Sequence, residues 1–325
     1  MAFIERIKRS NIIIVLNRLK LLLVLLALAV ILLFVNKDFF NNFNIKSFLN
    51  LASILGFIVI GESLVIITRG IDISVGKIAS LSTVILSASM IYFQNLFNAP
   101  IVILISVLVT LIAAAIMGSL NGFFISKLKI TPLISTLIVL WLATGFAEYI
   151  QKGRPTELVI KTFNIIGKGA IFNIIPYSSI VLLVILIIFY FILNKMPLGK
   201  YIYSVGGNEY AAYLSGVKTD RIKILVYILA AILSAVAGLF LAAMTGYGFP
   251  RVANGYEFTA ITAAVMGGIA LSGGKGNIVN GIIAIFILEL IYKFIFYVGI
   301  SPYLHGIIVG AILLITVYFN VTRNK

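Results

Sequence analysis

The chain has 325 residues, of which 62% are hydrophobic and 11% are charged, and its mean hydropathy is +1.16. This composition excludes an ordinary soluble domain, which needs about a quarter charged residues. The 25 Lys and Arg residues outnumber the 10 Asp and Glu, but they lie in short segments between apolar runs, which argues against nucleic-acid binding. With no cysteine and one histidine, disulfides and multi-histidine or thiolate metal sites are excluded.

Apolar runs of about 20 residues, the length that crosses a hydrocarbon core of about 30 Å, follow one another along the chain. They predict an all-α, polytopic integral membrane protein with about ten transmembrane helices, or nine because the eighth run is short and bounded by glycine. The first run lacks a small-residue cleavage site, so we interpret it as an uncleaved helix rather than a signal peptide. The predicted spans are 19–36, 48–68, 74–94, 99–125, 132–150, 177–194, 222–245, 257–271, 277–297 and 302–321.

Lys and Arg residues are unevenly divided between the two sets of connecting segments. Seventeen lie in the two terminal segments and in the loops predicted to be on the same side of the membrane as the termini. Seven lie in the loops on the other side. The positive-inside rule then predicts that both termini are cytoplasmic. We expect one transmembrane domain over 1–325 without a soluble domain, in a bacterial cytoplasmic (inner) membrane. Its longest loops are an extracytoplasmic one at about 151–176 and a cytoplasmic one at about 195–222.

Small residues recur every fourth position in the fourth span and in the seventh, which predicts close helix packing. Glu62, Glu148 and Glu289 are acidic residues that fall within predicted spans. A charge at mid-membrane costs about 2.5–3.5 kcal/mol, so each should face the bundle interior or water. Glu289 and Lys293 are spaced i, i+4, which favours a structural pair over a role in the pathway. Glu62 has no local partner.

Two glycine-bounded turns separate other spans. In the turn at 68–76, Asp72 or Ser74 is placed to cap the third span. The turn at 271–277 contains Gly-Gly-Lys-Gly, but it lacks the spacing and the final Ser or Thr of a phosphate-binding P-loop. We therefore expect no nucleotide site on this chain and no cofactor. Our candidate path or interface residues are Glu62, Asp72, Thr136 and Glu289.

The stretch 206–216 is the most structured polar sequence in the chain. Asn208 can cap a helix of about seven residues whose first turn holds Glu209, and Gly216 can end it. A helix this short is marginal without a partner, so it needs a surface to dock on.

Several of these pieces together resemble the permease subunits of ribose/xylose/galactose-type ABC importers, a branch that also contains autoinducer-2 permeases. The pieces run from about 55 to 320 and comprise GIDISVG at 70–76, NG at 121–122, KITPL at 129–133, GRP at 153–155, GGNEYAAYLSG at 206–216, GG at 267–268 and LSGGKG at 271–276. Two positions depart from the usual pattern: Tyr210 replaces a polar residue, and Arg69 replaces a glycine.

The resemblance implies a partner ATPase on the cytoplasmic side, an extracytoplasmic solute-binding protein, and a second permease copy, either identical or a sister chain, all in contact with membrane lipid. It also implies that the loop couples the chain to the ATPase, and this role falls on Gly207, Asn208, Glu209, Ala211, Ala212, Ser215 and Gly216. The expected function is an ATP-driven import path for a monosaccharide or similar small polar solute, with ATP hydrolysed on the partner.

Three alternatives remain open at this point. A related permease would carry a nucleoside or a branched-chain amino acid. An ion-coupled secondary carrier would use Glu62 and Glu289 and would transport without an ATPase. A membrane-embedded enzyme would need a catalytic set of side chains, and the sequence shows none at useful spacing.

Overall fold

A computed structural model describes residues 20–152, 154–301 and 304–323. Within these ranges, seven helices are long and apolar enough to cross a membrane, which confirms a helical, membrane-type fold. They correspond to the expected second to seventh spans and to the ninth. They are α2 (Asn42–Ile67), α3 (Val75–Phe93), α4 (Ala99–Ser126), α5 (Pro132–Gln151), α7 (Tyr177–Lys195), α10 (Thr219–Thr245) and α12 (Ile278–Tyr297).

The expected first and tenth spans correspond to shorter apolar helices. One covers Lys20–Val35 and is followed by the 3-10 helix η1 (Lys37–Phe40); the other is α13 (His305–Arg323), whose apolar part is Gly306–Tyr318. The count of ten and the side of the membrane on which each terminus lies stay predictions. Most of the basic residues predicted to precede the first span lie outside the described residues.

The eighth expected span, 257–271, was wrong as a continuous helix. Here α11 covers only Tyr256–Met266, which at 1.5 Å per residue is about 16 Å, roughly half the hydrocarbon core. The chain leaves the helix at Gly267 and Gly268, and Gly268 has φ +87°, a conformation that favours glycine.

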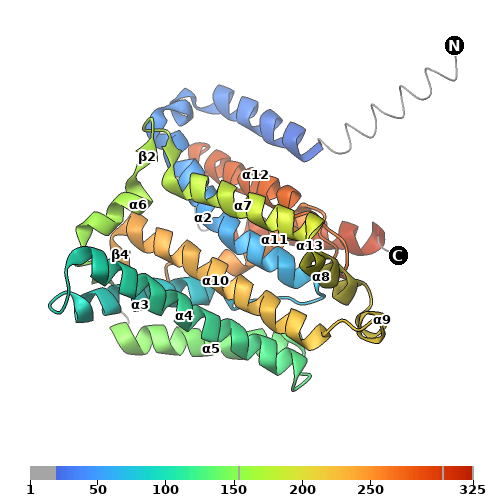
Figure 1. The fold of residues 1–325 in the computed structure, drawn as a ribbon. Coiled ribbons are helices and arrows are strands. Elements are labelled where there is room, and N and C mark those ends of the chain that lie inside the picture. Colours follow the sequence, from blue (N-terminus) through green and yellow to red (C-terminus); the bar gives the residue numbers. More distant parts are fainter. Residues whose placement is uncertain (1–19, 153, 302–303, 324–325) are drawn as a thin grey trace, which may run out of the picture.

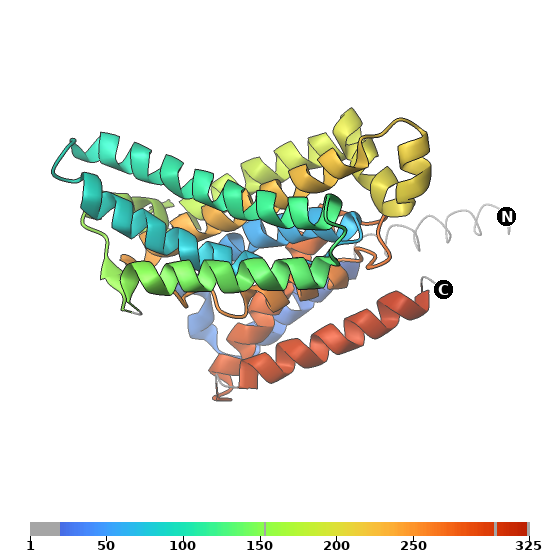
Figure 2. The ribbon, with the colours of Figure 1, turned by 90° about the horizontal axis from the view of Figure 1, so that it is seen from below.

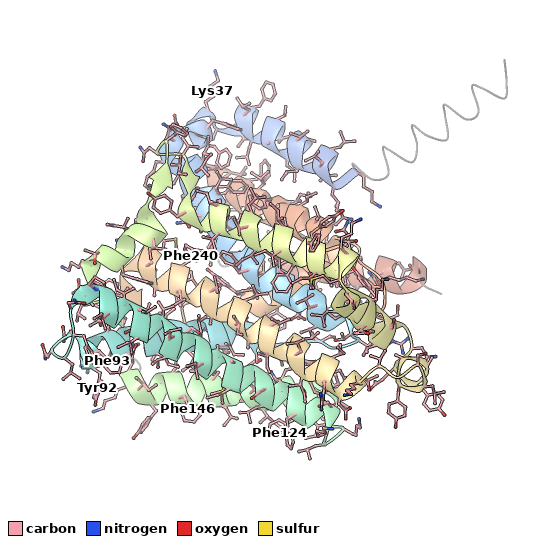
Figure 3. The ribbon with its side chains drawn as sticks, viewed as in Figure 1. Lys37, Tyr92, Phe93, Phe124, Phe146 and Phe240 are labelled. Atoms are coloured by element: carbon pink, nitrogen blue, oxygen red, sulfur yellow. The ribbon has the colours of Figure 1, made fainter. Side chains whose placement is uncertain are left out.

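Helix α2 forms the centre of the bundle, with 94% of its apolar window buried. It packs against α10, α12, α11 and α7, and α10 packs in turn against α4 and α3 (Figure 1). Phe240 of α10 lies in the interior, where its ring stacks on Phe57 of α2 with centroids 5.5 Å apart (Figure 3).

The predicted small-residue packing is confirmed between α4 and α10. A Cβ added to Gly118 would lie 2.5 Å from the Tyr227 carbonyl oxygen, and one added to Gly122 would lie 2.5 Å from Ile224 Cα. The backbones therefore approach more closely than a side chain would allow, as is typical of helices packed in lipid.

Two small strand pairs mark one end of the bundle, which we call the strand end. Strand β1 (Thr156–Glu157) pairs antiparallel with β4 (Tyr247–Gly248), and β2 (Ala170–Ile171) pairs with β3 (Ile175–Pro176). The segments η2 (Lys161–Phe163) and α6 (Asn164–Lys168) lie between β1 and β2 in sequence. The long loop at 151–176 is therefore folded against the bundle.

Two further helices, α8 (Pro197–Gly207) and α9 (Glu209–Leu214), lie at the opposite end, which we call the α9 end (Figure 1). The C-terminal end of α13 lies at the same end, and α13 runs along the outside of the bundle (Figure 2).

Candidate functional site

The α9 end contains the predicted short helix with its predicted caps. Asn208 Oδ1 accepts a hydrogen bond from the Ala211 amide at 3.0 Å, as an N-cap should. At the other end, Gly216 has φ +84°, its amide donates to the Tyr213 carbonyl, and the Val217 amide donates to the Ala212 carbonyl. These two bonds with a left-handed glycine form a Schellman motif. The helix has six residues rather than seven.

Helix α8, which occupies the first half of the same loop, was not predicted from the sequence. Pro197 stands in its first turn, where a missing N–H costs nothing, and Met196 before it is extended, as a residue preceding proline prefers. The expected single helix is therefore one of two, joined at Asn208, which ends α8 and caps α9.

The outward face of α9 is apolar. Tyr210, Tyr213 and Leu214 are 72%, 64% and 67% exposed, whereas Ala212 is buried. Of the other predicted coupling residues, Gly207, Asn208, Ala211, Ser215 and Gly216 are exposed. The large side chains of Tyr210, Tyr213 and Leu214 were not among the predicted coupling residues, although a helix this short cannot bury all its apolar residues against its own chain.

Glu209 points toward α10, where its carboxylate lies 2.5 Å from Lys223 Nζ. The lysine side chain is 15% exposed and the glutamate 41%, so the pair is partly shielded from water. It joins the start of α9 to a helix that runs the length of the bundle. A neighbouring ion pair links Asp220 of α10 to Lys127 and Lys129 after α4, and a cavity of about 580 Å³ lies between this cluster and α9.

Two of the sequence pieces that carried the resemblance, at 206–216 and 271–276, meet the C-terminal end of α2 next to α9. The Arg69 guanidinium donates to the Gly207 carbonyl at 2.6 Å, and the Gly274 amide donates to the Ile67 carbonyl at 2.8 Å. Gly206 packs between them, where a Cβ would overlap the Ile67 oxygen. The end of α2, the end of α8 and the turn at 271–276 are thus fixed to one another through their backbones.

The arginine at 69, which departs from the usual glycine, has φ +64°. This left-handed conformation is costly for a residue with a Cβ. The charged hydrogen bond from its side chain to Gly207 offsets part of that cost and adds a link that glycine lacks.

A buried polar network lies next to this contact, toward the interior of the bundle. The Glu62 carboxylate, assigned no local partner from the sequence, accepts from the Asp72 amide at 3.1 Å. Asp72 Oδ1 accepts from both the amide and the hydroxyl of Ser74, and that hydroxyl also accepts from the Asn121 side chain at 3.0 Å. Ser74 is the N-cap residue of α3, but its side chain makes no capping bond, so the cap predicted at Ser74 was wrong; Asp72, the other candidate, accepts from the amide of this N-cap residue. Thr136 Oγ1 lies 3.4 Å from the Ile71 carbonyl, at the edge of the same loop.

This network holds two carboxylates that are fully buried. Glu62 Oε2 and Asp72 Oδ2 have no hydrogen-bond partner among the described residues. Burial raises the pKa of Asp72 from 3.8 to about 6, against the opposing effect of its two bonds from Ser74. Two carboxyl groups that can become negatively charged therefore lie near the C-terminal end of α2 and the N-terminal end of α3. The turn at 68–74 connects them to the α9 end.

A second feature that was not predicted from the sequence lies between β4 and α11. The Phe249 amide donates to Thr83 Oγ1 at 2.9 Å, and the Ala253 amide donates to Ser80 Oγ at 3.1 Å. Ser80 lies 13 residues from the end of α3 at Phe93, about 20 Å down from the strand end. The segment 249–255 thus enters the bundle as irregular backbone, which membrane proteins tolerate only where it is surrounded by protein or lines a cavity.

Glu289 lies opposite this re-entrant segment, on α12. It is 4% exposed, and its Oε2 has no hydrogen-bond partner among the described residues. The predicted pair with Lys293 does not form an ion pair within 4.0 Å in the described part of the chain, although the two charges interact at longer range. Of the four candidate path residues, Glu62, Asp72 and Thr136 thus gather around one turn, and Glu289 stands apart.

Comparison with known proteins gives a consistent result. Residues 44–317 match the family model described as "Branched-chain amino acid transport system / permease component". The ribose import permease protein of Bacillus subtilis (strain 168) is 33% identical over 288 residues, covering 88% of this chain and 87% of the relative. The L-arabinose transport system permease protein of Escherichia coli (strain K12) is 37% identical, covering 63% and 62%, and the autoinducer 2 import system permease protein of Photorhabdus luminescens is 32% identical, covering 83% and 79%. No solved structure matches. The match over most of its length shows that this chain belongs to the permease family of these import systems.

Proposed function

We propose that the chain is the membrane-spanning subunit of an ATP-driven importer for a monosaccharide or similar small polar solute. Relatives named for ribose, arabinose and autoinducer 2 support this solute class over amino acids. In this assembly a second permease copy completes the path, a binding protein delivers the solute at the strand end, and an ATPase docks at the α9 end. The α9 end is then cytoplasmic.

The observation that carries the proposal is the exposed apolar face of α9 on a rigid base. Tyr213 and Leu214 leave an apolar face in solvent on a helix of only six residues, and such a face is typical of a surface that a partner covers. Its N-terminus is fastened to α10 through Glu209 and Lys223, so a displacement of α9 is transmitted to a helix that reaches the strand end. Short helices seated on a moving partner and joined to rigid spans fit alternating access driven by an ATPase.

A direct test replaces Tyr213 and Leu214 together with serine and measures how much ATPase co-purifies with the permease. We expect a loss of at least about tenfold, because two large, central apolar contacts are removed from a small interface. The matched control is Phe172→Ser, which removes an aromatic ring that is 88% exposed on the turn between β2 and β3, at the opposite end. The proposal fails if the α9 double variant retains the ATPase as well as the control does.

Dependence on ATP separates this proposal from an ion-coupled carrier. Proteoliposomes that contain the permease alone should take up no sugar when a proton or sodium gradient is imposed. Adding the ATPase, the binding protein and ATP should start uptake. Uptake by the permease alone would favour the carrier.

A further inference from the structure

We propose that the cavity between α2, α11, α12 and α13 is the site at which the permease binds its solute, and that Glu289 is the acceptor that recognises vicinal hydroxyl groups of a neutral sugar. This inference rests on the proposed function and adds a location and a chemistry to it. The cavity has a volume of about 560 Å³, within the range of about 300–1,000 Å³ for small-molecule pockets.

The cavity lies at the depth expected for a transported solute. Its lining includes Leu55, which is close to the middle of α2, and Gly255 and Tyr256, at the start of α11. The half-length α11 begins here because the re-entrant segment 249–255 has already crossed the half of the bundle at the strand end. Transporter sites are typically formed near the midplane by interrupted helices of this kind.

The N-terminus of α11 lies at the cavity, which Gly255 and Tyr256 line. The N-cap residue is Gly255, with φ +86° and no side chain, and the Glu257 carboxylate in the first turn interacts with the amides of Gly255 and Glu257. The N-terminal end of a helix carries partial positive charge and attracts oxygen acceptors. On its own this end would indicate little, but a second group faces the same cavity.

That second group is Glu289, a lining residue of the cavity, whose Oε2 is buried and has no hydrogen-bond partner among the described residues. A buried acceptor without a hydrogen bond is costly, so its retention in a cavity calls for a donor that arrives with a ligand. Sugar hydroxyls are such donors, and the rings of Tyr256 and Phe258 offer apolar surface for the C–H face of a sugar.

Helix α13 borders the cavity and contributes two glycines to its lining. Gly306 and Gly310 line it together with Val309 and Leu313, and a Cβ added to either glycine would meet nothing within 4 Å. A larger side chain at 310 should therefore enter open space without displacing the backbone. Ala311, next to it on the same helix, is exposed and outside the lining.

The test uses the complete importer in proteoliposomes, with radiolabelled D-ribose and L-arabinose as probes. Glu289→Gln should lower ATP-dependent uptake at saturating binding protein by at least about tenfold, the effect of losing one hydrogen bond to a charged group. Gly310→Leu should lower it by a similar factor, because its side chain would occupy the space that the solute needs. Ala311→Leu is the matched control and should transport at the wild-type rate. Wild-type uptake by both cavity variants overturns the proposal. So does loss of the second copy or of the ATPase from either variant, because the face would then be an assembly surface.

A binding measurement without ATP separates the pocket from the transport function. The chain has no cysteine, so Thr259→Cys in the cavity and Ala311→Cys outside it can each be labelled alone with a maleimide. D-ribose or L-arabinose at high concentration should slow labelling at 259 severalfold and leave 311 unchanged, whereas L-leucine should protect neither. Protection by sugar without ATP-dependent uptake would support the pocket and refute the proposed function. Uptake without protection at 259, or protection by leucine alone, would refute the pocket.

Discussion

Gly206 offers the sharpest test of how the α9 end is held together. It lies between two backbones, and a Cβ there would overlap the Ile67 carbonyl oxygen and lie 2.7 Å from the Gly274 amide nitrogen. These two groups bond to each other at 2.8 Å. Gly206→Ala must therefore move α8, the end of α2 or the turn at 271–276.

The expected cost combines two effects. Overpacking a tight backbone contact costs about 1–3 kcal/mol, and weakening the bond between Gly274 and Ile67 adds about 1 kcal/mol. We expect local destabilisation of about 2–4 kcal/mol, confined to the α9 end. The matched control is Gly207→Ala at the end of α8. A methyl group added there would meet open space, so this variant should be neutral or stabilised by up to about 1 kcal/mol.

Amide hydrogen exchange followed by mass spectrometry measures this directly. Peptides covering α8 and α9 should exchange faster in Gly206→Ala by a factor of about 30 or more, while peptides from α10 and α2 away from Ile67 keep wild-type protection. In the reconstituted importer the same variant should hydrolyse ATP with less solute moved per ATP. Unchanged exchange in Gly206→Ala, or equal damage from Gly207→Ala, would refute the argument that backbone contact at this point holds the loop.

Two further predictions concern charge. The folded-state pKa of Asp72 is raised to about 6 from 3.8, so the folded chain holds a proton that the unfolded chain has lost, and stability falls as the pH rises from about 4 to about 6. Asp72→Asn should therefore raise the melting temperature in detergent at pH 7, by up to the equivalent of about 3 kcal/mol, and flatten its pH dependence; a lower melting temperature would show that the charge is needed. Glu209→Lys should destabilise α9 by about 1 kcal/mol and weaken ATPase co-purification, and adding Lys223→Glu should restore both; failure of the double variant would mean that the pair does not anchor α9.

The class of the fold and much of the α9 end could be predicted from the sequence. Apolar length predicts spanning helices because lipid leaves the backbone no other way to satisfy its polar groups, and seven of the expected spans appear where the runs are. The caps of α9 were predictable because Asn208 and Gly216 act on their own neighbours within four residues, so no distant contact is needed to place them.

Features that depend on contacts between distant segments emerged only from the packed structure. The stretch at 257–271 is apolar enough to span, but hydropathy cannot show that residues 249–255 are drawn into the bundle by Thr83 and Ser80 and that α11 is short as a result. Glu289 and Lys293 have the spacing of a pair, but Glu289 lines a cavity that three other helices border. Local spacing limits which residues can meet within one helix, whereas the packing of separate helices selects which of them do. The proposed solute pocket depends on the packing of separate helices, so local spacing does not reveal it.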